Sequence, residues 1–119
     1  MMLRIDLSAE HRQLVLELLA ELLPPSAGVW VFGSRATGRA RRYSDLDLLI
    51  DAGRLLSRDE AALLREAFEE SDLPYGVDIV DCHAIGARFR QLIAAQRLPL
   101  VDAANSSPTI ASSPGSNGK

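Results

Sequence analysis

Two aspartates, Asp45 and Asp47, stand at the start of a short apolar run, Leu48-Leu49-Ile50. Short apolar runs bounded by turn residues are typical of strands. Side chains at alternate positions of a strand share one face and lie roughly 6.5–7 Å apart along it. Two carboxylates at that spacing can share one divalent ion or hold two, and hard oxygen ligands of this kind are typical of Mg²⁺. We therefore expect a magnesium site at these two aspartates.

A glycine and a serine, Gly33 and Ser34, directly follow another apolar run, Val29-Trp30-Val31-Phe32. Glycine has no Cβ, so a bulky anionic group can approach the backbone closely at that position. Ser34 suits the N-cap of a following helix, and the free N–H groups of a helix N-terminus favour phosphate. The pair predicts a phosphate-binding turn.

The segment between this turn and the two aspartates is locally cationic, although the chain as a whole is acidic. It contains four arginines, Arg35, Arg39, Arg41 and Arg42, and no acidic residue lies between Glu21 and Asp45. For Arg35 we weigh a phosphate contact equally with a solvated surface position. For the other three, the solvated surface is the favoured interpretation.

These motifs together resemble a known signature. Gly33-Ser34, ten intervening residues and then Asp45-Leu46-Asp47 are similar to the motif of the polymerase-β-type nucleotidyltransferases. The Gly-Ser-Arg-Ala-x-Gly and Ser-Asp-Leu-Asp details, with the short chain, most resemble the minimal nucleotidyltransferase (MNT) group. Members of that group are commonly paired with HEPN-domain proteins as antitoxin and toxin. The resemblance covers about residues 28–81.

The resemblance implies a fold, an activity and a partner. The expected fold is α/β (α+β), with a small mixed sheet of about three strands packed on one side by helices. The expected activity is Mg²⁺-dependent transfer of a nucleoside monophosphate, AMP from ATP, onto a hydroxyl group. The expected acceptor is a partner protein, a HEPN-type toxin that is silenced by the attachment.

Two-metal transfer of this kind usually needs a third carboxylate, as a metal ligand or a general base. If Val77 and Ile79 face the core, Asp78 between them faces the same side as the first two aspartates. Asp81 has the opposite parity, and Asp51 lies too far along its strand. The family's Val-Asp-Ile-Val-like strand also matches Asp78. The predicted catalytic and metal-binding residues are thus Asp45, Asp47 and Asp78, and the predicted nucleotide-binding residues are Gly33, Ser34 and Arg35.

Periodicity and capping signals place these residues on a simple succession of elements, and Ser57 with Glu60 three residues later predicts a capping box. The expected helices are Ser8 to about Leu23, Ser34 to about Gly38, Ser57 to about Glu70 and Ala84 to about Gln96, and the expected strands are 29–32, Asp45 to Asp51 and Val77 to Asp81. A nucleotidyltransferase domain is expected over residues 1–104, and a disordered tail rich in Ser, Pro, Gly and Asn over 105–119.

Composition limits the partners. The net charge of −3 and the sequence pI near 5.3 argue against general nucleic-acid binding, because such binding needs a basic face. One cysteine, Cys82, cannot form an internal disulfide, which fits a reducing cytoplasm. No run of membrane length occurs. We interpret Cys82 as a packed residue and His11 and His83 as surface or cap residues, since no zinc-like spacing links them.

Two other functions compete with transfer to a protein. The first is a binding module that keeps the fold and neutralises its partner by masking it. The three like-charged carboxylates argue against this, because a mask has no need to crowd them. The second is transfer to a small molecule, as in the antibiotic nucleotidyltransferases, which resemble this chain at the motif but carry an added domain for the acceptor.

Overall fold

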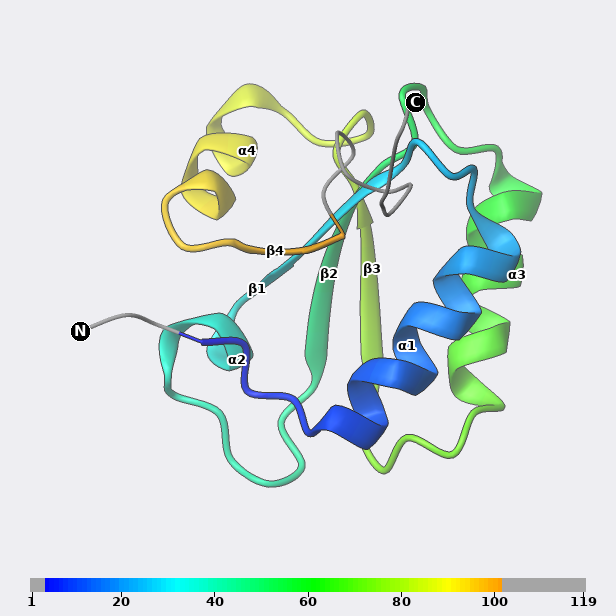
Figure 1. Ribbon diagram of the computed structural model, residues 1–119. Coiled ribbons are helices and arrows are strands. Elements are labelled where there is room, and N and C mark those ends of the chain that lie inside the picture. Colours follow the sequence, from blue (N-terminus) through cyan, green and yellow to red (C-terminus); the bar gives the residue numbers. More distant parts are fainter. Residues whose placement is uncertain (1–3, 102–119) are drawn as a thin grey trace, which may run out of the picture.

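The computed structural model describes residues 4–101, which form four helices and four strands (Figure 1). In chain order these are α1 (Ala9–Leu22), β1 (Gly28–Phe32), α2 (Ser34–Thr37), β2 (Leu46–Asp51), α3 (Arg58–Glu69), β3 (Val77–Asp81), α4 (Ala87–Ala94) and β4 (Leu98–Val101). The expected tail and the boundary proposed at residue 104 lie outside the described residues. Within residues 4–101, no helix combines the length and the apolar character that a membrane crossing requires.

The strands form one mixed sheet in the order β3-β2-β1-β4. Strand β1 is antiparallel to both of its neighbours, whereas β2 and β3 run parallel. The mixed α/β fold is as predicted, but the sheet has four strands rather than three. The fourth strand, β4, was not predicted because it has only four residues and includes Pro99. Proline is compatible with an edge strand, where its missing N–H breaks no internal ladder.

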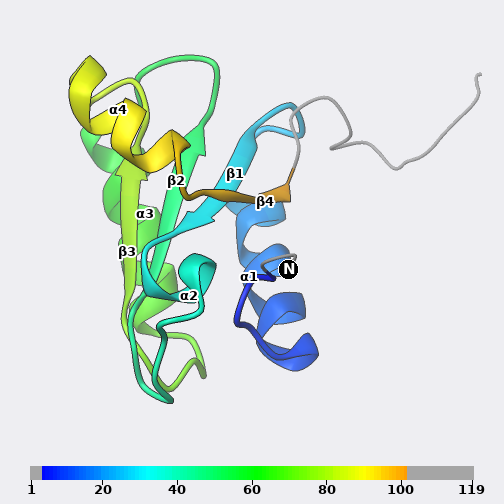
Figure 2. The same cartoon turned by 90° about the vertical axis from the view of Figure 1, so that its left-hand side faces the viewer.

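One face of the sheet packs against α1 and α3 (Figures 1 and 2). Leu46, Leu48 and Ile50 alternate along β2 and are fully buried in this core. Val15 of α1 and Leu64 of α3 belong to the same cluster. Because strand side chains alternate, the intervening residues of β2, which include Asp47 and Asp51, face the other way. The alternation predicted for this strand is therefore confirmed.

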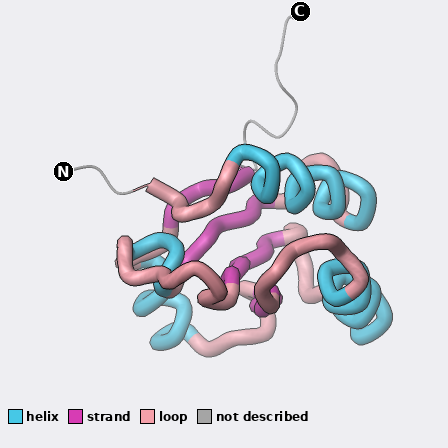
Figure 3. Tube along the Cα trace, turned by 90° about the horizontal axis from the view of Figure 1, so that it is seen from below, coloured by secondary structure: helices cyan, strands magenta, loops and turns pink. Residues whose placement is uncertain are grey.

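The opposite face of the sheet is partly covered by α4, which lies across the sheet from α1 and α3 in Figure 1. Leu49, which points away from the main core, is fully buried, and so is Ile93 of α4. Seen from below, the strands lie between helical segments on both sides (Figure 3). The sequence predicted helices on one side only, so the second apolar layer is a correction to that expectation.

Local sequence signals predicted the starts of α1 and α3 correctly, but not the start of α4. The Ser8 hydroxyl accepts the His11 N–H and caps α1, and Ser57 with Glu60 forms the predicted capping box at α3. The last helix is shorter than expected, because it begins only after Gly86 at its N-cap. The Ala84 N–H instead donates to the Asp81 carbonyl in a turn after β3.

Candidate functional site

Gly33 lies between β1 and α2 and touches the carboxylate of Asp47. Its φ of 72° falls in the left-handed region that side chains other than glycine rarely adopt. A Cβ built on Gly33 would lie 2.1 Å from Oδ2 of Asp47 and 3.1 Å from its Cγ. Glycine is therefore required on two grounds, and the turn is pressed directly against the carboxylate.

Asp47 and Asp78 are register partners on the parallel strands β2 and β3. Partial burial raises the pKa of the Asp47 carboxyl from its ordinary value of 3.8 to about 6, with further contributions from the charge of Asp78, a hydrogen bond with Asp78 and the charge of Asp45. This pair thus crowds like charge at one place on the sheet, where a bound proton or a cation would relieve the repulsion.

Asp45 lies just before β2 and is exposed. Its Oδ1 atom approaches Gly76, where an added Cβ would lie only 2.9 Å away. The carboxylate oxygens of Asp45, Asp47 and Asp78 do not all lie within 4.8 Å of one another. Among the described residues, the acidic, histidine and cysteine side chains that meet this distance lie at the other end of β2 and β3. The structure thus brings Asp47 and Asp78 together and leaves Asp45 at the margin of the pair.

Ser34 is the first residue of α2, and Gly33 occupies the N-cap. The prediction that Ser34 caps this helix is therefore wrong by one residue. Thr37 donates its hydroxyl to the Gly33 carbonyl at 3.2 Å, which holds the short helix onto the turn. The phosphate contact expected of Ser34 stays a prediction.

Arg35 is 5% exposed, and its guanidinium is engaged by the protein itself. It lies over the Tyr75 ring, 3.9 Å from the centroid. It also donates at 2.8 to 3.2 Å to three backbone carbonyls, those of Asp6, Ser44 and Arg42. These contacts tie the N-terminal segment and the loop before β2 together. The geometry favours this loop-holding role over the predicted side-chain contact with a nucleotide.

Gln96, between α4 and β4, is a site residue that the sequence analysis missed. Its Oε1 atom accepts the N–H of Gly33 at 3.0 Å. The contact links the turn to the C-terminal elements across 63 positions of the chain. No local pattern marks a glutamine for such a contact, so only the fold reveals it.

The two alternative third carboxylates lie at the far ends of their strands. Asp51 ends β2 and contacts Nε2 of His83 at 2.8 Å. Asp81 ends β3, and its oxygens accept the N–H groups of Leu56 and His83. Neither adjoins Gly33. The arrangement leaves Asp78 as the partner of Asp47.

Comparison with known proteins adds independent findings. The family model described as the nucleotidyltransferase domain matches residues 12–101. The protein called "Probable protein adenylyltransferase MntA" of Haemophilus influenzae is 42% identical over an alignment of 93 residues, and the alignment covers 76% of this chain and 78% of that protein.

Similar solved structures include the following two. One is the crystal structure of a toxin–antitoxin with AMP-PNP, with a TM-score of 0.66 and 25% identity over 76% of this chain and 73% of that one. The other is a proposed minimal nucleotidyltransferase, with a TM-score of 0.59 and 35% identity over 76% of this chain and 89% of that one.

The matched segment includes the glycine turn, the strands that carry the aspartates, and Gln96. The geometry of these parts and the identity to the relatives point to one enzyme class. The chain belongs to the nucleotidyltransferase domain family, and it is a nucleotidyltransferase of the minimal, MntA type.

Proposed function

We propose that this enzyme moves AMP from ATP, with Mg²⁺, onto a hydroxyl group of a partner protein, a HEPN-type toxin. One observation carries the proposal: the Asp47–Asp78 pair, with the raised pKa of Asp47, is pressed against the glycine of a sharp turn. The pair suits a divalent cation, and the turn beside it suits phosphates.

The aspartates fit Mg²⁺ by the chemistry of their donors. All the ligand atoms are carboxylate oxygens, and a magnesium site normally has one or two carboxylates plus substrate phosphates. Asp47 and Asp78 would hold the ion, with Asp45 as the third carboxylate. Bound Mg²⁺ supplies charge neutralisation at the phosphates during transfer. Asp47 would gain most from the ion, because a cation would offset the burial and the neighbouring like charges that raise the pKa of its carboxyl.

The turn would hold the phosphates next to this pair. Ser34, at the start of α2, offers its hydroxyl and backbone, and Gln96 fixes Gly33 from the other side. The acceptor oxygen forms a bond to the α-phosphorus, the bond from that phosphorus to the β-phosphate oxygen breaks, and pyrophosphate leaves. The hydroxyl proton passes to a carboxylate of the site or to solvent.

A protein acceptor is supported by the surface beside the turn. Helix α4 leads into Gln96 and exposes two large apolar side chains, Phe89 (45%) and Leu92 (60%). A partner docked on these side chains could supply the orientation that transfer needs. The similar protein from Haemophilus influenzae is described as a protein adenylyltransferase, and another relative occurs in a toxin–antitoxin structure. The single cysteine fits a cytoplasmic location.

Intact-mass measurement tests the proposal. The protein is incubated with ATP, Mg²⁺ and the proposed HEPN-type partner, and the partner is then weighed. We expect the partner to gain the mass of AMP, and we expect no gain with Asp47→Asn or with a chelator. A partner that stays unmodified and is neutralised equally well by Asp47→Asn would overturn transfer in favour of masking.

A further inference from the structure

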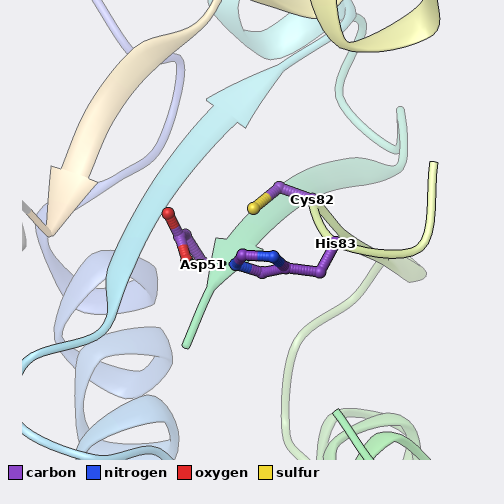
Figure 4. Close-up of side chains that lie close together, drawn as sticks. All are labelled: Asp51, Cys82 and His83. Atoms are coloured by element: carbon purple, nitrogen blue, oxygen red, sulfur yellow. Dashed lines mark hydrogen bonds and ion pairs between the residues drawn. The ribbon is translucent and has the colours of Figure 1, made fainter. Parts of the chain in front are cut away.

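A second group of chemically capable side chains lies at the other end of β2 and β3. Asp51 ends β2, and Cys82 and His83 directly follow β3 (Figure 4). Asp51 is four residues along β2 from Asp47, which corresponds to about 13 Å in a strand. The group is therefore separate from the candidate nucleotide site.

The three side chains converge. One ligand atom from each, a carboxylate oxygen, the thiol sulfur and a ring nitrogen, lies within 4.8 Å of the other two. Nε2 of His83 is 2.8 Å from Oδ1 of Asp51. Figure 4 shows the thiol and the ring both directed toward the carboxylate. The side chains of Asp51 and His83 are 40% and 38% exposed, so an ion from solvent can reach them.

Backbone contacts hold each of the three residues in place. The Cys82 N–H donates to the Ile50 carbonyl at 2.9 Å, which continues the ladder between the strands. The His83 N–H donates to Asp81 at 2.9 Å, and the Gly53 N–H donates to Asp51 at 2.8 Å. A site whose ligands are already fixed loses little conformational freedom when an ion binds.

The donor set identifies the class of ion. Sulfur, imidazole nitrogen and carboxylate oxygen together suit Zn²⁺, whereas Mg²⁺ and Ca²⁺ take oxygen ligands. Three protein ligands leave the fourth tetrahedral position to water. A nucleophilic Cys–His–Asp triad is a poorer match, because in such a triad the ring lies between the other two. Here the carboxylate oxygen, the thiol sulfur and the ring nitrogen all lie within 4.8 Å of one another, so the ring does not separate the thiol from Asp51.

We propose that Asp51, Cys82 and His83 bind one zinc ion, which joins the end of β2 to the turn between β3 and α4. The Cys82 thiol loses its proton to solvent as its sulfur bonds to the metal. The site is independent of the nucleotide reaction, so either can exist without the other.

Zinc titration of four proteins tests the site. All carry Asp47→Asn, which weakens metal binding at the candidate nucleotide site. The first has no other change, the second adds Cys82→Ser, the third adds His83→Gln, and the fourth adds His11→Gln as the matched control at the other histidine. We expect one Zn²⁺ per chain in the first and fourth, and binding at least about ten-fold weaker in the second and third. Circular dichroism with a chelator checks that each variant is folded.

Alkylation of the wild-type protein is the second readout and needs no variant. Cys82 is the only cysteine in the chain, so the mass gain reports on it alone. We expect Zn²⁺ to slow alkylation and Mg²⁺ to leave its rate unchanged. Zinc affinity that is equal in all four proteins, or alkylation that Zn²⁺ does not slow, would overturn the proposal.

Discussion

The two ends of the β2–β3 pair carry the same residue type in opposite electrostatic settings. At one end, Asp47 adjoins Asp78 and Asp45, and burial and these like charges raise the pKa of its carboxyl to about 6. At the other end, Asp51 is hydrogen-bonded to the His83 ring and to the Gly53 N–H, and these hydrogen bonds hold the pKa of its carboxyl below its usual value. Asp51 therefore has hydrogen-bond partners within the fold, while Asp47 depends on a ligand that brings positive charge.

This contrast shows how the function can be recognised in the structure. A folded chain stabilises an aspartate most simply by placing donors around it, as it does at Asp51. At Asp47 it instead adds acidic neighbours and a tightly packed glycine, which lowers stability without a bound cation. Such an arrangement is typical of a functional site.

The largest expected effect comes from removing the charge of Asp47. We expect Asp47→Asn to slow AMP transfer at least about 1,000-fold, because a metal-bound phosphate arrangement contributes several kcal/mol to the transition state. Single-turnover rates with saturating partner measure the effect. The matched variant Asp51→Asn, at the other end of the same strand, should keep the wild-type rate. Equal loss in the two variants would show that the strand, and not the site, was damaged.

The second effect concerns the glycine that touches Asp47. We expect Gly33→Ala to lower the free energy of unfolding by about 2–3 kcal/mol, because it adds both backbone strain and a clash. Gly53→Ala is the control: its φ of 82° gives the same strain, but no atom lies within 4 Å of the added Cβ. It should cost about 1 kcal/mol. Urea unfolding measures both, and equal losses would contradict the close contact.

A smaller effect is expected at Gln96, which accepts the Gly33 N–H. Gln96→Ala should reduce kcat/KM for ATP about three- to ten-fold, on the scale of one hydrogen bond that positions the turn. Gln91→Ala, an exposed position in α4, is the matched control and should have no effect. A wild-type value for Gln96→Ala would remove Gln96 from the site.

The smallest effect is a pH dependence of stability without metal. Between pH 3.8 and about 6, the folded chain retains a proton on Asp47 that the unfolded chain has lost, so the free energy of unfolding falls as pH rises. Solvent screening of this partly exposed group limits the change to about 1 kcal/mol. Asp47→Asn should abolish this part of the pH dependence. Asp51 contributes with the opposite sign, since its stabilisation is lost as pH falls.

The parts of the fold that local patterns encode could be predicted from the sequence. The Ser57–Glu60 capping box and the alternation along β2 each depend on residues within one element, and both appear as expected. Strand β4 could not be predicted, because its sequence is short and includes a proline that only an edge position tolerates.

The residues of the candidate site also fall into those that local sequence patterns predicted and those that only the fold brings together. The spacing of Asp45 and Asp47 predicted that their side chains share one face of the sheet. Alternation along the strand of Asp78 predicted that its side chain lies on the same face, and Asp78 is the register partner of Asp47. Contacts between distant segments had no local signal, and these include the bond from Gly33 to Gln96. The proximity of Asp51 to Cys82 and His83 was missed for the same reason. The spacing used to search for zinc ligands cannot detect residues that two parallel strand ends bring together.

Pro99 in β4 has a consequence for how partners can attach. An edge strand ordinarily offers unpaired N–H and C=O groups to a strand from another chain. In β4, Pro99 has no N–H to offer, and its pairing with β1 shifts register between Val29 and Trp30. The opposite edge, β3, bears two aspartates, a charge pattern that discourages strand addition. We therefore expect complexes of this enzyme to form through helix and loop side chains, and not by extension of the sheet.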